Sequence, residues 1–462
     1  MSRALQSDLV ATAVDYADRW LEYQLRTRRC PGVTAAVRLG GELLLSTAHG
    51  LADIDSATPM RPDHVFRIAS HSKTVTATLV AQLVEQEVLR YDDRVVQHLP
   101  WLGDDAKTLG RTTLRDLLSH STGVYRDGEA GDFWQFDGDF PDEPTLRAMA
   151  TDRAQVLPAN QQFKYSNVGF ALLGQVLEVV TGSSYADLVR ERIARPLGLP
   201  GLVAELTGEV GPMATGYTSR RFGMSRVALP HTTTGAYVAA TGCCATAENL
   251  ALFAEAHCFG VPGLLSDDAK RVMQQPLWAV EGEKQHYALG LQCFDVGPRS
   301  VLGHGGAFPG FITATRFDPS ESLVVVVLTN AIDGPAAELA NGIVRLIDSA
   351  HDGDGPAAEP DADRFAGRFY SVWGVTDIVR IGRRLVAVDL DRIDPSDHQT
   401  VLRPISDDEL EIVSTSGLRN PGEQVCYDFA DDGSVRSIRF GAQTLLPLDA
   451  FRETPYAGRP ES

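Results

Sequence analysis

A serine and a lysine stand three residues apart at the start of an apolar segment. The stretch FRIASHSKTVTATLVAQLV, residues 66–84, places Ser70 and Lys73 directly ahead of Val75 and Leu79. In a helix this spacing puts two side chains one turn apart on the same face, so the lysine amine would lie beside the serine hydroxyl. Serine needs a neighbouring base to become nucleophilic, and lysine can be that base when burial or a helix N-terminus lowers its pKa. The spacing indicates acyl chemistry at Ser70, against the alternative of a capped helix with a solvated lysine.

Two further clusters carry groups that could complete such a site. The stretch QFKYSNVGFALLG places Tyr165 and Asn167 just before a strongly apolar segment. Tyr165 could shuttle a proton and Asn167 could orient the lysine or the substrate, although a helix N-cap would also explain the asparagine. The stretch VLGHGGAFPGF places His304 ahead of two predicted strands, where a glycine turn with an exposed histidine is the alternative. Ser-x-x-Lys occurs once in the chain, and its two companions make a combined site the preferred interpretation.

The segments around these clusters predict an antiparallel sheet interrupted by helices. Residues 32–50 read as a β-hairpin, and residues 311–330 read as two strands joined across a turn at 318–321. Residues 167–182 carry an apolar stripe typical of a helix, and residues 336–350 predict a final helix. Strands at both ends with helices between them favour a mixed α/β (α+β) fold whose sheet is completed by the two end segments.

Three parts are predicted along the chain. Residues 1–350 form a catalytic domain that begins with an amphipathic helix near residues 9–21, and residues 351–362, rich in Gly, Pro, Ala and Asp, form a linker. Residues 363–462 alternate apolar and polar positions between Gly- and Asp-containing turns, which is typical of a small antiparallel sandwich or barrel.

Composition limits the partners and the location. The 462 residues carry a net charge of −19, which disfavours nucleic acid and anionic membranes. No apolar run reaches the roughly 18 residues of a membrane span or forms the core of an export signal. Six scattered cysteines favour free thiols in a reducing cytoplasm. The eleven histidines lack the spacing of metal ligands, so neither a metal nor another cofactor is indicated.

The three clusters resemble the motifs of the penicillin-recognising serine hydrolases. Ser70-His71-Ser72-Lys73, Tyr165-Ser166-Asn167 and His304-Gly305-Gly306 occur in the order and context of the branch that holds class C β-lactamases, D-alanyl-D-alanine peptidases, D-aminopeptidases and related esterases. The similarity covers roughly residues 20–350. It implies a five-stranded antiparallel sheet with a helical domain and a site at their junction. Residues 363–462 resemble the lipocalin-like β-barrel domain of the D-aminopeptidases.

The resemblance also implies a role for each residue. Ser70 would be the acylated nucleophile, Lys73 its activating partner, and Tyr165, helped by Asn167, the group that exchanges protons with the attacking and leaving groups. His304 would line the facing strand, and the backbone N–H groups of Ser70 and Ala307 would form the oxyanion hole. His-Gly-Gly lacks the cation and hydroxyl of the Lys-Thr-Gly found in resistance enzymes, so efficient β-lactamase activity is not expected.

The leading expectation is a serine acyl-hydrolase acting on small amides, peptides or esters, with D-configured residues among its substrates. A second interpretation is an acyltransferase or thioesterase that cyclises nonribosomal peptides, with a carrier-protein-bound peptidyl thioester as its partner. A third is an inactive binding module, because one fold can host many functions.

Overall fold

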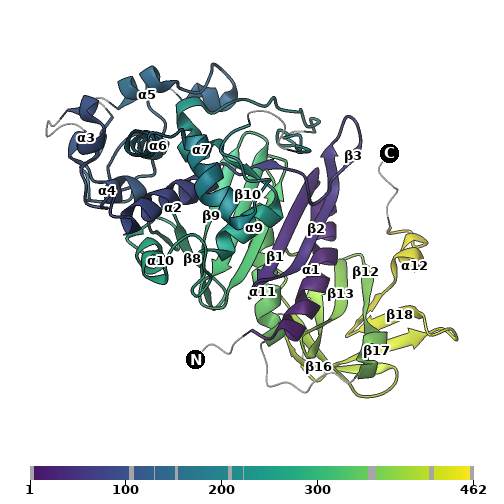
Figure 1. The fold of residues 1–462 in the computed structure, drawn as a ribbon. Helices are drawn as coiled ribbons and strands as arrows, with labels where there is room; N and C mark the ends of the chain where they lie inside the picture. The colour runs from purple at the N-terminus through teal and green to yellow at the C-terminus, as the bar shows by residue number, and fades with distance from the viewer. Residues whose placement is uncertain are drawn as a thin grey trace. The chain divides into compact units, whose positions relative to one another are not determined.

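The computed structural model describes residues 5–103, 109–129, 131–150, 154–206, 211–221, 223–351, 360–415 and 421–457. Contacts divide the chain into two compact units, Arg29–Ala340 and the pair of segments Met1–Arg28 and Asn341–Ser462. The division falls inside helix α11 (Ala336–His351) (Figure 1). Most of the predicted linker, at 352–359, lies outside the described residues.

An antiparallel sheet forms the centre of the unit Arg29–Ala340. Among the described residues its strand order is β3-β2-β1-β11-β10-β9-β8-β7-β6. The five longest strands lie side by side in this order, and short strands extend the sheet at both edges to nine. The strands are β1 (Gly32–Leu39), β2 (Glu42–Asp53), β3 (Thr58–Pro59), β6 (Trp278–Ala279), β7 (Gln285–Tyr287), β8 (Gln292–Val296), β9 (Arg299–Phe308), β10 (Phe311–Asp318) and β11 (Leu323–Thr329).

The predicted strands of this unit are confirmed. Strand β1 turns into β2 across Gly40 and Gly41, both of which have positive φ. Every residue of β11 is buried, which explains its uninterrupted run of apolar side chains. Strands β1 and β10 flank β11 in antiparallel register, with Ala35 and Ala314 both opposite Val327. The segment before the helices and the segment after them therefore complete one sheet, as predicted.

Helices of the same unit lie beside this sheet (Figure 1). They are α2 (His71–Glu85), α3 (Val95–His98), α4 (Leu114–Leu118), α5 (Glu143–Met149), α6 (Asn167–Thr181), α7 (Tyr185–Val189), α8 (Arg195–Leu197), α9 (Ala247–Glu255) and α10 (Asp267–Gln274). Strand β4 (Phe66–Arg67) directly precedes α2 and pairs with β5 (Cys244–Ala245) in a separate two-stranded sheet. Helix α6 packs against α2 and against a π-helical turn, η6 (Val238–Gly242). Helices α2 and α6 are buried along most of their length. Helix α6 is correspondingly apolar nearly all round, whereas α2 also buries polar side chains such as Lys73 and Thr76.

The second unit contains an eight-stranded antiparallel sheet that resembles a barrel. Its strands follow chain order, and Tyr370 in the first strand exchanges backbone hydrogen bonds with Leu446, which directly follows the last strand, at 2.7 and 2.9 Å. Apolar side chains such as Phe369, Leu385 and Tyr427 fill its core. The strands are β12 (Gly367–Ser371), β13 (Gly374–Ile381), β14 (Arg384–Asp389), β15 (Thr400–Pro404), β16 (Glu409–Thr415), β17 (Gln424–Phe429), β18 (Val435–Phe440) and β19 (Gln443–Leu445), followed by helix α12 (Leu448–Arg452).

The N-terminal helix belongs to this second unit. Helix α1 (Ser7–Thr27) buries the predicted apolar face, including Trp20. Its Gln24 side chain donates a hydrogen bond to the carbonyl of Leu390 at 2.8 Å, and the N–H of Gly382 donates to Thr12 Oγ1 at 2.6 Å. The grouping differs from the sequence-based division at residue 350 because amphipathicity predicts a buried face but does not identify the surface that covers it.

Among the described helices, none combines the length and the apolar character that crossing a membrane requires.

Candidate active site

Ser70 lies at the N-terminal end of helix α2, as the spacing predicted. It occupies the N-cap position, yet its side chain makes no capping hydrogen bond, so the hydroxyl is not committed to the helix. The preceding residue, Ala69, has φ of 49°, a left-handed conformation that is strained for a residue with a side chain. Ser72 holds this turn, because its hydroxyl donates to the Ala69 carbonyl at 2.6 Å and accepts from the Cys243 N–H at 2.9 Å. Within the described part of the chain, the N–H of Ser70 has no hydrogen-bond partner.

Lys73 is directed at Ser70 from the next turn of α2. Its Nζ lies 3.2 Å from Ser70 Oγ and donates a hydrogen bond to the Ala240 carbonyl at 2.8 Å. Its side chain is completely buried, so the alternative of a capped helix with a solvated lysine does not hold. Its Nζ also lies 4.8 Å from the ring centre of Tyr165 and 5.7 Å from that of Phe170. The amine is therefore enclosed by two rings, one carbonyl and the serine hydroxyl.

Burial changes the protonation of this amine. It lowers the pKa of Lys73 well below the ordinary value of 10.5, because a charged amine loses its hydration in the interior. The Asp127 carboxylate opposes this shift and the Arg126 guanidinium reinforces it. The direction of the shift favours a neutral lysine, the form that can accept a proton from a hydroxyl.

Tyr165 approaches the same serine from a different segment. Its hydroxyl donates a hydrogen bond to Ser70 Oγ at 2.8 Å. Burial raises the pKa of Tyr165 above its ordinary value of 10.0, so the phenol keeps its proton. The next residue, Ser166, is the N-cap of α6 and accepts a hydrogen bond from the Gly169 N–H at 3.0 Å. The cap fixes where α6 begins and thereby fixes the residue that precedes it.

Asn167 is the first residue of α6, and its amide bonds to a carboxylate that the sequence did not single out. Its Nδ2 donates to Asp127 Oδ1 at 2.6 Å, and its buried Oδ1 has no partner among the described residues. The capping hydroxyl belongs to Ser166, so the N-cap alternative for Asn167 does not hold. The bond to Asp127 orients the amide and leaves one acceptor oxygen available.

His120 supports the Tyr165 segment. Its Nδ1 accepts a hydrogen bond from the Ser166 N–H at 3.1 Å, and its ring centre lies 4.3 Å from that of Tyr165. This contact holds the segment that carries Tyr165. The only sequence signal was its occurrence in LLSHSTG, with nothing to indicate which loop it contacts.

His304 lies in strand β9, and its ring is buried rather than exposed. Its Nδ1 lies 2.6 Å from the Gly305 carbonyl, which can only accept, so Nδ1 carries the hydrogen. Its Nε2 then accepts from the Tyr287 hydroxyl at 3.0 Å. Burial lowers the pKa of His304 well below 6.5. Strand β9 therefore presents a neutral imidazole that is held by the Tyr287 hydroxyl. Tyr287 belongs to no sequence motif and was not predicted as a partner of His304.

Gly306 allows β9 to approach the turn that carries Ser70. A Cβ at this position would lie 2.3 Å from the Ile68 carbonyl oxygen, a contact that no side chain tolerates. The N–H of Gly305 points toward β8 and away from β10, because it donates a hydrogen bond to Gln292 Oε1 at 2.8 Å. In a strand, the N–H groups of every second residue point in the same direction. The Ala307 N–H thus also points away from β10, at the end of β9 where β8 no longer pairs. Its direction fits the predicted oxyanion role.

Replacing Gly306 with alanine is expected to lower kcat/KM by about 100-fold, because a shift of roughly 1 Å between β9 and the Ser70 turn misplaces the reacting groups. The matched control is Gly305→Ala, whose Cβ would have no neighbour closer than 3.8 Å. Hydrolysis of a p-nitrophenyl ester by the two variants checks this prediction. Equal activity of both variants would show that the close approach of β9 does not matter.

A buried ion pair also lies close to this site. Arg67, three residues before Ser70, is completely buried and donates to Glu205 Oε1 at 2.6 Å and to the Gly242 carbonyl at 3.1 Å. Its guanidinium lies 4.9 Å from the ring centre of Phe308 at the end of β9. It connects the start of the Ser70 turn to η6 and to β9. An arginine in a short strand carries no sequence signal for such a role.

The comparisons with known proteins agree with this fold. The family model described as Beta-lactamase matches residues 17–348. A D-aminopeptidase of Brucella anthropi is 26% identical over 335 residues, covering 68% of this chain and 59% of that protein. Esterase EstB of Burkholderia gladioli is 32% identical over 203 residues, covering 39% of this chain and 49% of that protein. The crystal structure of SurE superposes with a TM-score of 0.62 at 25% identity, covering 94% of this chain and 99% of that one.

The chain spans about half the length of the curated relatives it matches. The family model nevertheless covers most of the residues, including all three clusters around Ser70, Tyr165 and His304. This chain belongs to the Beta-lactamase family.

Proposed function

We propose that this chain is a serine acyl-hydrolase that works through a covalent acyl-enzyme on small amides, peptides or esters. The observation that carries the proposal is the convergence of two groups on Ser70 Oγ, Lys73 Nζ at 3.2 Å and Tyr165 OH at 2.8 Å. Both distances lie near hydrogen-bonding range, which proton transfer requires. The catalytic roles of Ser70, Lys73, Tyr165, Asn167 and His304 are part of this proposal.

The directions of the two pKa shifts assign different roles to Lys73 and Tyr165. Burial favours a neutral Lys73, so its amine accepts the Ser70 proton while the serine oxygen forms a bond to the acyl carbon. Burial keeps Tyr165 protonated, so the phenol supplies the proton with which the leaving amine or alcohol departs. The proton on Lys73 then restores Tyr165. The N–H groups of Ser70 and Ala307 stabilise the negative oxygen that forms between these steps.

Water completes the cycle by the same chemistry in reverse order. It attacks the acyl carbon, its proton passes to the base, and the bond from Ser70 Oγ to the acyl group breaks as the serine regains a proton. The products are a carboxylic acid and the free enzyme. The neutral, buried His304 adds no cation, so a substrate carboxylate at β9 would have no charged partner there.

Asp127 supports a substrate that carries a free amine. Its carboxylate bonds to Asn167, pairs with the exposed Arg126 at 3.1 Å, and lies close enough to Lys73 to oppose the lowering of that pKa. An ammonium group beside the scissile carbonyl would place its charge against this carboxylate. Amides and peptides with a free amino terminus therefore fit better than N-acylated ones. The name of the D-aminopeptidase relative supports D-configured residues among these substrates.

Replacing Asp127 with asparagine is expected to lower kcat/KM by about 10-fold to 100-fold for a D-amino-acid amide with a free amine, because a charge-assisted contact is lost. The variant retains an acceptor oxygen for Asn167, so the site keeps its shape. The same amide with an acetylated amine is the control, and its turnover should change by less than about 3-fold. Equal losses for both substrates would argue against recognition of the amine.

Acyl transfer remains the second candidate, because the first half of the reaction is identical and only the acceptor of the acyl group differs. The substrate would then be a peptidyl thioester, free or bound to a carrier protein, and its own amine would replace water. Incubation with a synthetic peptidyl thioester followed by mass spectrometry separates the two reactions. We expect the linear acid, whose mass exceeds that of the macrocycle by one water; a macrocycle as the main product would favour the transferase.

We also propose a cytoplasmic location. The six cysteines are all free, and no disulfide joins any of the described residues. Unpaired thiols are typical of reducing compartments.

A further inference from the structure

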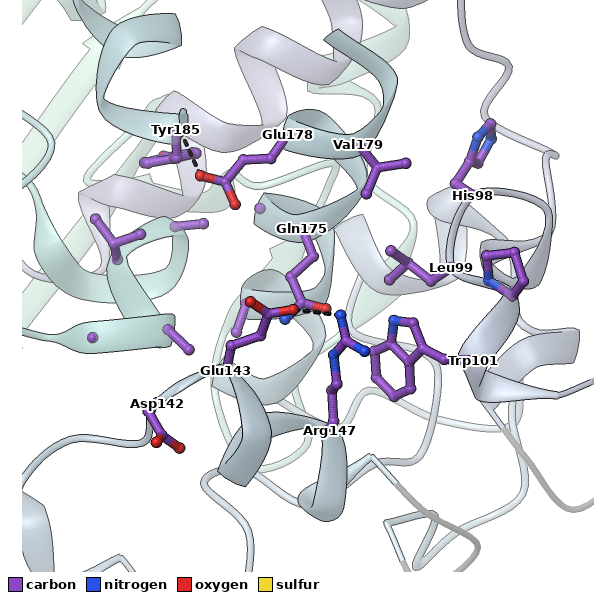
Figure 2. Close-up of a pocket in the computed structure, with 17 residues that line it drawn as sticks. His98, Leu99, Trp101, Asp142, Glu143, Arg147, Gln175, Glu178, Val179 and Tyr185 are labelled. Atoms are coloured by element: carbon purple, nitrogen blue, oxygen red, sulfur yellow. Dashed lines mark hydrogen bonds and ion pairs between the residues drawn. The ribbon is translucent and has the colours of Figure 1, made fainter. Parts of the chain in front are cut away.

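A cavity of about 550 Å³ lies within the unit Arg29–Ala340, and its lining does not include Ser70 or Lys73 (Figure 2). Helices α5 and α6 form part of its wall, together with residues 98–101, 235–236 and 238–239. Leu99, Ala171 and Val179 contribute apolar surface. The cavity is large enough for a small organic molecule, since ligand pockets start near about 300 Å³.

A glutamine in this cavity has no hydrogen-bond partner. Both polar atoms of the Gln175 carboxamide are shielded from water and unpaired within the described residues, and so is Nε1 of Trp101. Figure 2 shows the Gln175 side chain beside Glu143 and Arg147. A buried polar group without a partner is unfavourable. A carboxamide offers one donor and one acceptor side, and a second carboxamide satisfies both at once.

The charges around the cavity leave an excess of carboxylates. Arg147 is paired with Glu143 and lies 5.1 Å from the ring centre of Trp101. Glu178 is exposed and accepts a hydrogen bond from the Tyr185 N–H at 2.8 Å, but no cation pairs with it among the described residues. Asp142 also lines the cavity. Three carboxylates against one guanidinium favour a ligand that carries positive charge.

Entry to the glutamine requires the movement of one exposed side chain. The Arg147 and Glu143 side chains are 48% and 58% exposed. Exposed ion pairs hold their geometry weakly, so Arg147 can leave Glu143 at little cost. Its departure would uncover the faces of Gln175 and Trp101, beside which it lies (Figure 2).

We propose that this cavity binds a small molecule that carries both a protonated amine and a carboxamide on an aromatic or apolar group. The carboxamide pairs with Gln175, the amine faces Glu178, and the apolar group packs against Trp101. An amino-acid amide has this chemistry, but the inference does not depend on the proposed function, since none of these residues touches Ser70.

The cavity shares a wall with the segment that holds the lysine. Ala239 lines it, and the carbonyl of the next residue, Ala240, accepts the hydrogen bond from Lys73. Gly174 lets α6 approach this segment closely, since a Cβ there would lie 2.7 Å from the Ala239 Cβ. A bound molecule would therefore contact the turn η6 at Ala239, one residue before the carbonyl that accepts from Lys73.

Calorimetric titration of phenylalanine amide into the full-length Ser70→Ala variant tests the proposal without turnover. We expect a Kd of about 1 mM, in keeping with the affinity that a ligand of this size reaches. N-acetylphenylalanine amide lacks the cation and phenylalanine lacks the carboxamide, so each should bind at least about 10-fold more weakly. Adding Gln175→Leu should weaken the binding of phenylalanine amide by about the same factor.

Two controls locate the binding site. Asp268→Asn removes an exposed carboxylate of α10 outside the cavity and should leave Kd unchanged. Asp127→Asn alters the active site and should leave the Kd of the cavity site unchanged, even if it weakens a second binding event at the active site. Glu178→Gln, at an exposed position, replaces Gln175→Leu if that variant does not fold. Binding that is insensitive to both cavity variants, or absent altogether, would overturn the proposal. Binding lost only in Asp127→Asn would overturn it while supporting amine recognition at the active site.

Discussion

Replacing Ser70 with alanine is expected to lower kcat/KM by about 10⁴-fold or more, because a covalent route cannot proceed without the nucleophile. The fold should remain intact, since the Ser70 side chain makes no capping bond to helix α2. Hydrolysis of D-amino-acid amides and p-nitrophenyl esters, with thermal unfolding beside it, measures both effects. A fluorescent phosphonate should label the unmodified chain and not the variant.

Ser72→Ala is the matched control in the same turn. Its hydroxyl donates to the Ala69 carbonyl and accepts from the Cys243 N–H, so its loss leaves the buried Cys243 N–H unpaired and leaves the Ala69 carbonyl with only the Ser72 N–H. We expect the free energy of unfolding to fall by about 2 kcal/mol. The loss of kcat/KM should be far smaller than for Ser70→Ala. Turnover or phosphonate labelling that survives in Ser70→Ala would refute the assigned nucleophile, and an unlabelled natural chain would support an inactive binding module.

Replacing Lys73 with methionine is expected to lower kcat by about 10³-fold, the usual contribution of a positioned base. The free energy of unfolding should change by less than about 1 kcal/mol, because an apolar side chain of similar length fills the space and no amine is desolvated. The Ala240 carbonyl loses its donor, which opposes part of this gain. Single-turnover kinetics with an activated ester, together with chemical unfolding, measure the two quantities.

Lys270 supplies the control for a buried lysine that performs no chemistry. It is also completely buried, and its Nζ donates to the carbonyls of Cys258 and Val261. Lys270→Met should lower the free energy of unfolding by about 2 to 4 kcal/mol, because several acceptors lose their donor, and should leave kcat nearly unchanged. The opposite patterns of the two variants distinguish a base from a structural lysine. Similar loss of stability with retained activity in Lys73→Met would assign Lys73 a structural role.

Much of the fold could be predicted because its signals are local. The two β-rich runs around Gly40 and Gly41, the uninterrupted apolar run of β11 and the apolar stripe of α6 each depend on neighbours within one segment. Helix α1 shows what local signals cannot predict. Its apolar face was predictable, but its association with Asn341–Ser462 depends on contacts with residues more than 300 positions away, such as Gln24 with Leu390.

The same distinction applies to the candidate site. Ser70 and Lys73 lie one helical turn apart, so their juxtaposition follows from helix geometry alone. Asp127 and Tyr287 were missed, because neither belongs to a motif and each meets its partner, Asn167 or His304, only through tertiary packing. His304 is buried and not exposed as a glycine turn would leave it, because the sheet places Tyr287 of β7 within hydrogen-bonding distance of it.

The amino-acid sequence by itself determined which chemical groups are present and which of them share a helix turn or a strand. Only the tertiary structure decided the direction in which the pKa of each group shifts. The pKa of Lys73 is lowered because Tyr165, Phe170 and the segment of Ala240, all distant in sequence, enclose the amine away from water. A pKa depends on the medium around a group, and that medium exists only after separate segments have packed together.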